Sequence, residues 1–239
     1  MAAIVRAVHT GTLKGIEPVV VISSRADAGG LEKARRLGIK TLVISPRQFA
    51  DRDAFGTALL KACHSARAEL ISKNGWLPLT PNSVVKGYAE RIINQHPGPL
   101  DPGSGHDFGG KGMYGKRVLC ARIAYSWLSG KDYWTEATTH IVTENYDEGH
   151  IIRAAKFSLP RNHFSESELS QQTRLLRTTT ETLQAQLFPL EYKTVIATLQ
   201  DLANGVTRTF TRKRRLIPPK KYAILDTVKQ LAIKIFPYG

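Results

Sequence analysis

The sequence predicts an α/β protein with a doubly wound, mainly parallel sheet of Rossmann-like type, followed by a basic, helical C-terminal extension. Short apolar runs alternate with segments of helical periodicity through the first two-thirds of the 239-residue chain. Strand, helix and strand repeated at this spacing is typical of parallel βαβ units. The composition, 42% hydrophobic and 23% charged, belongs to a globular protein with an ample core.

Six short apolar segments are predicted as strands, and helical patterns lie between or beside them. The predicted strands are residues 18–22, 41–44, 70–72, 91–94, 138–142 and 151–155. The predicted helices are residues 2–13, 28–37, 51–65, 81–88 and 116–129.

Beyond the sixth strand, the chain is expected to be helical. Ser165 and Glu168 have the spacing of a capping box, which predicts a long helix after them. Pro189 is expected to interrupt that helix, because its ring fixes φ and removes a hydrogen-bond donor. A second helix is then expected to end at Asn204 and Gly205.

Residues 97–115 are rich in glycine and proline and are predicted to form a loop. Loops of this length inside compact domains are uncommon and often functional. Residues 110–115 fit Gly-x-Gly-x-x-Gly, but a dinucleotide site needs a strand directly before the glycines. We instead expect a substrate-facing loop that leads into helix 116–129, whose N-terminus is a possible anion site.

Charge and cysteine content narrow the class of protein. The formal net charge is +14, which favours anionic partners such as RNA, membrane surfaces or phosphorylated substrates. Cys63 and Cys120 are too few to staple a chain of this size. No apolar run approaches the length of a membrane span, and the first residues lack the pattern of a secretion signal. A cytoplasmic location and no metal site are predicted.

Asn94 and His96 stand at the end of a predicted buried strand, before Pro97 and Gly98. Alternate side chains of a strand share a face, so these two point to the same side. The carboxyl ends of parallel strands are where open α/β sheets bind ligands. An amide beside an imidazole can polarise a carbonyl and move a proton. The plainer alternative is that both side chains only bond nearby backbone.

Several segments together resemble the formyltransferase family, and in particular its members that act on glycinamide ribonucleotide. Residues 93–97 resemble its Asn-x-His-Pro active-site motif, and residues 139–149 resemble the strand and loop that carry an active-site aspartate. Residues 75–81 resemble its folate-binding loop. Further matches, in the same order, are residues 25–32, 34–35, 38–39 and 49–52.

The resemblance implies transfer of a formyl group from 10-formyltetrahydrofolate to the amine of glycinamide ribonucleotide, in purine biosynthesis. Asn94, His96 and Asp147 would be catalytic. The residues implied in folate binding are Trp76, Leu77, Pro78, Leu79 and His140, and those implied in substrate binding are Arg52 and Gly98. His140 has a structural alternative, as a buried core histidine.

Three regions depart from the family pattern. The family's first strand and its Gly-Ser-Asn phosphate loop have no counterpart before helix 2–13, for which a gene start placed too late is the expected explanation. Residues 98–115 replace the family's Ser-Leu-Leu-Pro, which leaves the acceptor amine open. His150 replaces the usual proline.

We expect a catalytic domain over residues 1–205 and a basic tail over residues 206–239. The tail holds nine Lys or Arg and one Asp, and its basic run 208–221 precedes an amphipathic helix. This helix could bind RNA or an anionic membrane, or could pack on the core or on another subunit. Alternative functions are formyl transfer to an amino sugar or initiator tRNA, and an inactive formyltransferase-like protein that binds partners through its tail. A homodimer is a further option.

Overall fold

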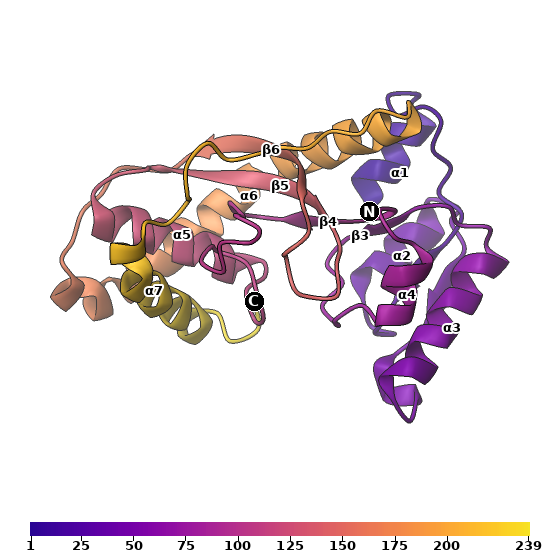
Figure 1. The fold of residues 1–239 in the computed structure, drawn as a ribbon, viewed down its shortest axis with the longest axis horizontal. Coiled ribbons are helices and arrows are strands. Elements are labelled where there is room, and N and C mark those ends of the chain that lie inside the picture. The colour runs from indigo at the N-terminus through magenta and orange to yellow at the C-terminus, as the bar shows by residue number, and fades with distance from the viewer. The chain divides into compact units, whose positions relative to one another are not determined.

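The computed structural model describes the whole chain, residues 1–239, and Figure 1 labels helices α1 to α7 and strands β3 to β6. The chain forms two compact units, each described by itself. Unit 1 comprises residues 1–94, 141–145 and 195–207, and unit 2 comprises residues 95–140, 146–194 and 208–239.

Unit 1 contains the alternating helices and strands predicted for the first part of the chain. Its helices are α1 (Ala2–His9), α2 (Gly29–Arg36), η1 (Pro46–Gln48), α3 (Arg52–Ser65) and α4 (Asn82–Gly87). Its strands are β1 (Val21–Ser23), β2 (Thr41–Val43), β3 (Ile71–Lys73) and most of β4 (Ile92–His96). Strands β1 and β2 pair in parallel, as do β3 and β4, so the predicted parallel α/β architecture is confirmed.

Strand β1 is shorter than predicted and lies further along the chain. Its ladder with β2 runs from Val21 to Ser23. The N–H of Val21 donates to the carbonyl of Lys40, and the carbonyl of Ser23 accepts from Ile44, each at 2.9 Å. Pairing therefore decides where the strand begins and ends, and residues 18–20 lie outside the ladder although they are apolar.

The core of unit 1 brings helices α3 and α4 onto strand β4. Asp51 caps α3 by accepting a hydrogen bond from the N–H of Ala54 at 2.8 Å, which starts the helix where the sequence predicts it. The buried apolar cluster consists of Phe55, Leu59, Cys63, Val84, Tyr88, Ile92 and Val142. This packing holds the start of β4, the strand that carries Asn94 and His96.

Unit 2 combines an antiparallel pair of strands with long helices. Its elements are the end of β4, α5 (Lys116–Ser129), β5 (Trp134–Ile141), β6 (Ile151–Ser158), η2 (Glu166–Gln172), most of α6 (Thr173–Ala203), η3 (Pro219–Lys221) and α7 (Tyr222–Ile235). Strands β5 and β6 pair in antiparallel fashion from Trp134 and Ser158 onward. No helix or strand occupies residues 97–115, as predicted.

Helix α7 packs against α5, which is itself buried from Arg117 to Trp127. The apolar face of α7 presents Leu225, Val228, Ala232 and Ile235, all buried. The amphipathic helix of the basic tail therefore buries its apolar face within unit 2. Of the alternatives predicted from the sequence, this is the one in which the helix packs on the core. No helix of the structure has the length and apolar character that a membrane crossing needs.

The predicted interruption of the long helix at Pro189 is wrong. The capping box of Ser165 and Glu168 is present, and after the 3-10 helix η2, α6 continues through Pro189 for 31 residues to Ala203. Proline removes one i→i−4 hydrogen bond, but Pro189 is exposed, so water can satisfy the carbonyl left without a partner. Buried Leu187 and Val195 anchor the helix on both sides by packing, which outweighs the lost bond.

Candidate active site

His96 ends strand β4 and is buried, with 3% of its surface exposed. Its Nδ1 atom lies 3.0 Å from the carbonyl oxygen of Gly98. A carbonyl only accepts hydrogen bonds, so Nδ1 carries a proton. The Nε2 atom is buried and has no hydrogen-bond partner in the protein. Buried polar atoms normally have partners, so the unpartnered Nε2 makes His96 a candidate binding or catalytic residue.

Gly98 lets the chain turn back on His96. A Cβ atom at this position would lie 2.4 Å from Cγ1 of Val118 in α5, which no side chain tolerates. The Gly98 carbonyl also accepts a hydrogen bond from the hydroxyl of Thr138 at 2.9 Å. Gly98 thus orients the imidazole through its backbone, in addition to the substrate contact that the sequence predicts.

Asp147 faces two histidines. Its Oδ2 atom lies 4.0 Å from Nε2 of His96, and its Oδ1 atom lies 3.5 Å from Nε2 of His140. The backbone N–H of Gly110 donates to Oδ2 at 3.0 Å. Asp147 has a φ of 59°, the left-handed conformation that aspartate tolerates better than most residues. This backbone turn helps to aim the carboxylate at the two imidazoles.

The surroundings of Asp147 keep it ionised. Burial alone would raise the pKa of this carboxyl, because the charged form loses its hydration. The hydrogen bond from His140, the charges of His96 and His140, and the Gly110 N–H outweigh burial, so the pKa of Asp147 lies well below its ordinary value. The carboxylate is therefore available to stabilise a positive charge on His96.

Glycines in the 97–115 loop bring the loop against Asp147. A Cβ atom on Gly109 would lie 2.8 Å from Cβ of Asp147 and 2.7 Å from Cδ2 of Leu100. Asp107 shapes the turn, because its carboxylate accepts from the N–H groups of Gly109 at 2.8 Å and Asp101 at 2.7 Å. Sequence reasoning found this loop but missed its contact with Asp147, since nothing local indicates a partner 37 residues away.

The other predicted site residues belong to unit 1. Asn94 is half-buried and pairs with Lys73 in the parallel ladder. The ring of Trp76 stacks on Phe55 with centroids 6.2 Å apart. Arg52 donates to the carbonyl of Thr80 at 3.0 Å.

The remaining predicted folate residues differ in exposure: Leu77 is 51% exposed, while Pro78 and Leu79 are half-buried.

Of the predicted site residues, the structure brings four together within unit 2: His96, Gly98, His140 and Asp147.

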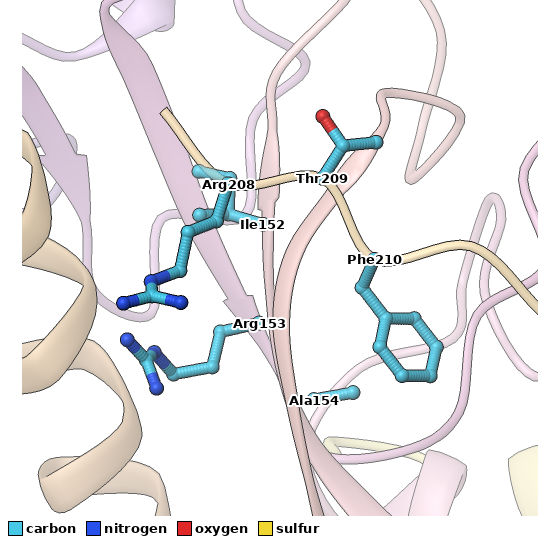
Figure 2. A pocket seen from close by; sticks show the side chains of 6 residues that line it. All are labelled: Ile152, Arg153, Ala154, Arg208, Thr209 and Phe210. Carbon is cyan, nitrogen blue, oxygen red and sulfur yellow. The ribbon is translucent and has the colours of Figure 1, made fainter. Parts of the chain in front are cut away.

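Unit 2 also contains a cavity of about 350 Å³ beside strand β6. It is lined by Ile152, Arg153, Ala154, Arg208, Thr209 and Phe210. In Figure 2 the guanidinium groups of Arg153 and Arg208 face one another. The N–H of Phe210 donates to the carbonyl of Ile151 at 2.7 Å, which ties the start of the basic segment to β6.

The parallel strand pairs and the helices between them define an α/β protein of Rossmann-like fold, and a histidine lies near a carboxylate at the end of one of its strands. The chain matches the formyl transferase family over residues 1–183, more than half of its length. The protein belongs to the formyl transferase family, as its motifs predict.

Several relatives and solved structures similar to this chain are phosphoribosylglycinamide formyltransferases. The chloroplastic phosphoribosylglycinamide formyltransferase of Arabidopsis thaliana is 32% identical over 151 residues, which are 62% of this chain and 48% of the plant protein. Glycinamide ribonucleotide transformylase 1 from Symbiobacterium toebii superposes with a TM-score of 0.66 at 25% identity, covering 87% of both chains. Phosphoribosylglycinamide formyltransferase from Brucella melitensis superposes with a TM-score of 0.65 at 27% identity, covering 88% of this chain and 92% of that one.

The chain spans about half of the length of the plant relatives that it matches. Similarity to the bacterial structures extends further, over 87% or more of both chains.

Proposed function

We propose that this protein transfers a formyl group from 10-formyltetrahydrofolate to the amine of glycinamide ribonucleotide, a step in purine biosynthesis. The family, and the names of the relatives and similar structures, support this reaction. The observation that carries the proposal is the buried Nε2 atom of His96, which lacks a protein partner and lies 4.0 Å from the Asp147 carboxylate.

In the proposed reaction, the amine attacks the formyl carbon and the formyl oxygen becomes an oxyanion. Since Nδ1 of His96 already donates to Gly98, protonation at Nε2 gives an imidazolium whose Nε2–H can donate to that oxygen. Asp147 stabilises the imidazolium and relays the proton that leaves the attacking amine. Asn94, two residues before His96, would donate a second hydrogen bond to the oxyanion. Collapse of the tetrahedral intermediate breaks the bond to N10 of the folate, which takes up a proton.

The remaining site residues are proposed as binding residues. Trp76, Leu77, Pro78 and Leu79 would contact the pterin, together with His140, and the large exposed fraction of Leu77 suits an apolar ligand surface. Arg52 would contact the substrate phosphate through guanidinium N–H groups other than the one given to Thr80. Gly98 would contact the substrate. In this proposal, residues 1–205 form the catalytic region.

The experiment is a turnover assay on the purified chain with 10-formyltetrahydrofolate and glycinamide ribonucleotide, following release of tetrahydrofolate. Parallel reactions offer an amino sugar, an aminoacylated initiator tRNA, or no amine. Turnover that requires glycinamide ribonucleotide supports the proposal. Turnover with another amine alone would reassign the acceptor, and release without any amine would identify a hydrolase.

A contact of the basic segment 208–221 with RNA is the second candidate function. Lys213, Arg214, Arg215 and Lys220 of this segment are exposed. An anionic partner would bind here with an affinity that falls steeply with salt. RNA binding of this kind without formyl transfer would favour the binding-protein alternative. Homodimerisation and the cytoplasmic location stay predictions, to be checked by light scattering and by fractionation.

A further inference from the structure

The 97–115 loop has no helix or strand of its own, and the C-terminal segment (Arg208–Gly239) holds it along its length. Nε of Arg212 donates to the carbonyl of Leu100 at 2.5 Å. The N–H of Leu216 donates to the carboxylate of Asp101 at 2.8 Å. The basic tail therefore contributes directly to the structure around the candidate active site.

Two contacts further along continue this attachment. The ring of His106 stacks on Tyr222, the first residue of α7, with centroids 3.4 Å apart and an interplanar angle of 4°. Arg117 joins the end of α7 to the loop, because its guanidinium donates to the carbonyls of Phe236 and Gly112, both at 2.8 Å.

Lys229 makes the attachment nearest to Asp147. It is half-buried on α7, between the buried residues Val228 and Ala232 and thus on a firmly packed helix. Its ammonium group donates to the carbonyl of Asp107 at 3.0 Å and to the carbonyl of Gly109 at 2.8 Å. Partial burial of a charged group costs free energy, because the group loses hydration, and these two hydrogen bonds offset part of that cost.

The carbonyl of Gly109 and the N–H of Gly110 belong to the same planar peptide group. Lys229 donates to the oxygen of this group, and the N–H of the group donates to Asp147 at 3.0 Å. The positive charge, the peptide dipole and the carboxylate are thus aligned in one chain of hydrogen bonds, in which each strengthens the next.

Without Lys229, the carbonyl of this peptide group would lose its hydrogen bond, and the bond from the Gly110 N–H to Asp147 would remain as the contact that orients the group. Two adjacent glycines allow a peptide group to rotate with little steric resistance, and Gly110 already has a φ of 97°. Rotation by half a turn would point the carbonyl oxygen at the carboxylate and remove the N–H from it.

We propose that Lys229 is a positioning residue for the reaction: it holds the Gly109–Gly110 peptide so that the Gly110 N–H binds the Asp147 carboxylate. The inference rests on the proposed function for the role of Asp147, but the hydrogen-bond geometry does not depend on it. Burial lowers the pKa of Lys229, and the carboxylates of Asp107, Asp226 and Asp147 oppose this effect, which links the ammonium electrostatically to Asp147.

The test compares Lys229→Met, which removes the donors, with Lys229→Arg, which keeps the charge. Lys234→Met serves as control, because Lys234 is an exposed lysine of the same helix. We expect Lys229→Met to lower kcat by about tenfold to a hundredfold, the range for a misplaced catalytic group, with KM unchanged. The loss should appear in kcat and in the protection of the Gly110 amide together, since Lys229 acts through the position of that peptide group. Lys229→Arg should recover part of both effects.

Amide hydrogen exchange provides a readout that does not need turnover. Gly110 should exchange at least about tenfold faster in Lys229→Met, while amides in α5 keep their protection. If the wild type shows no formyl transfer but Gly110 responds in this way, the proposed function fails and the positioning contact stands. An unchanged kcat and unchanged Gly110 exchange in Lys229→Met would overturn the inference, as would an equal loss of protection throughout the chain. Should Lys229→Met not fold, Lys229→Gln, which removes the ammonium group and shortens the side chain, takes its place, and wild-type kcat together with wild-type Gly110 exchange in that variant would also overturn the inference.

Discussion

The Nε2 atom of His96 lies 4.0 Å from Oδ2 of Asp147, and it is the buried nitrogen of that ring for which the protein provides no hydrogen bond. Its other ring nitrogen is committed to Gly98. The imidazole is therefore fixed through one ring nitrogen, while the other has no hydrogen bond within the protein and lies near a carboxylate.

Replacement of either member of this pair should remove most activity. His96→Ala loses the proposed oxyanion donor, and Asp147→Asn loses the charge that stabilises the imidazolium. Each should lower kcat by about a hundredfold to ten-thousandfold, the usual range for general acid–base groups, without unfolding the protein. Steady-state kinetics and circular dichroism check this. Glu144→Gln, in the same loop and exposed, should behave as wild type. Wild-type turnover in Asp147→Asn would remove Asp147 from the mechanism.

Asp147 should also make folding stability depend on pH. Its pKa in the folded protein lies below the ordinary value of 3.8. The native state then binds fewer protons than the unfolded state, so the carboxylate stabilises the fold above pH 3.8 and this contribution is lost as the pH falls further. Urea unfolding at several pH values should show wild type and Asp147→Asn converging in acid. A constant difference between them down to pH 3 would contradict this.

Gly109→Ala should disturb the site without altering a functional group. The added methyl would meet the Cβ atom of Asp147 at 2.8 Å and Leu100 at 2.7 Å, so the loop or Asp147 must move. We expect a loss of about 1–3 kcal/mol of stability, as for overpacked cores, and a lower kcat. Thermal unfolding and kinetics measure both. Gly30→Ala is the matched control, because a Cβ atom there meets nothing within 4 Å.

Arg212 should contribute to the free energy of unfolding, although it lies in the basic segment 208–221. Its guanidinium pairs with the carboxylate of Glu136 at 2.5 Å, and Glu136 is 1% exposed. Arg212→Met would leave that charge buried without its partner, which costs about 3–5 kcal/mol. Lys213→Met, its exposed neighbour, should change stability very little. Equal denaturation midpoints for the two variants would contradict the structural role of Arg212.

Glu191 should destabilise the protein at alkaline pH. Burial raises the pKa of this carboxyl from 4.5 to about 7. The native state then holds a proton that the unfolded state releases, so this favourable contribution is complete below pH 4.5 and is lost as the pH rises through 7. Glu191→Gln should therefore be more stable than wild type at pH 8 and similar to it at pH 4. Urea unfolding midpoints of both proteins at the two pH values measure this, and equal midpoints at pH 8 would contradict the prediction.

Local patterns predicted much of this structure. The alternation of apolar runs and helical segments identified α2, α3, α5 and the strand that carries His96 to within a few residues. Pro189 misled the prediction, because local backbone chemistry says nothing of the packing that holds α6 on both sides of it.

The sequence by itself determined the α/β class and the family, because periodicity and motifs are encoded by residues close together in the chain, and the family resemblance pointed to His96 and Asp147 as candidates. Only the tertiary structure decided what surrounds that pair. Gly110 reaches Asp147 across 37 residues, and Lys229 reaches Gly109 across 120. Contacts between segments so distant in sequence depend on how helices and loops pack, and no local pattern records that packing. The basic tail, which its charge alone suggested to be a binding surface, therefore emerges as part of the support of the candidate active site.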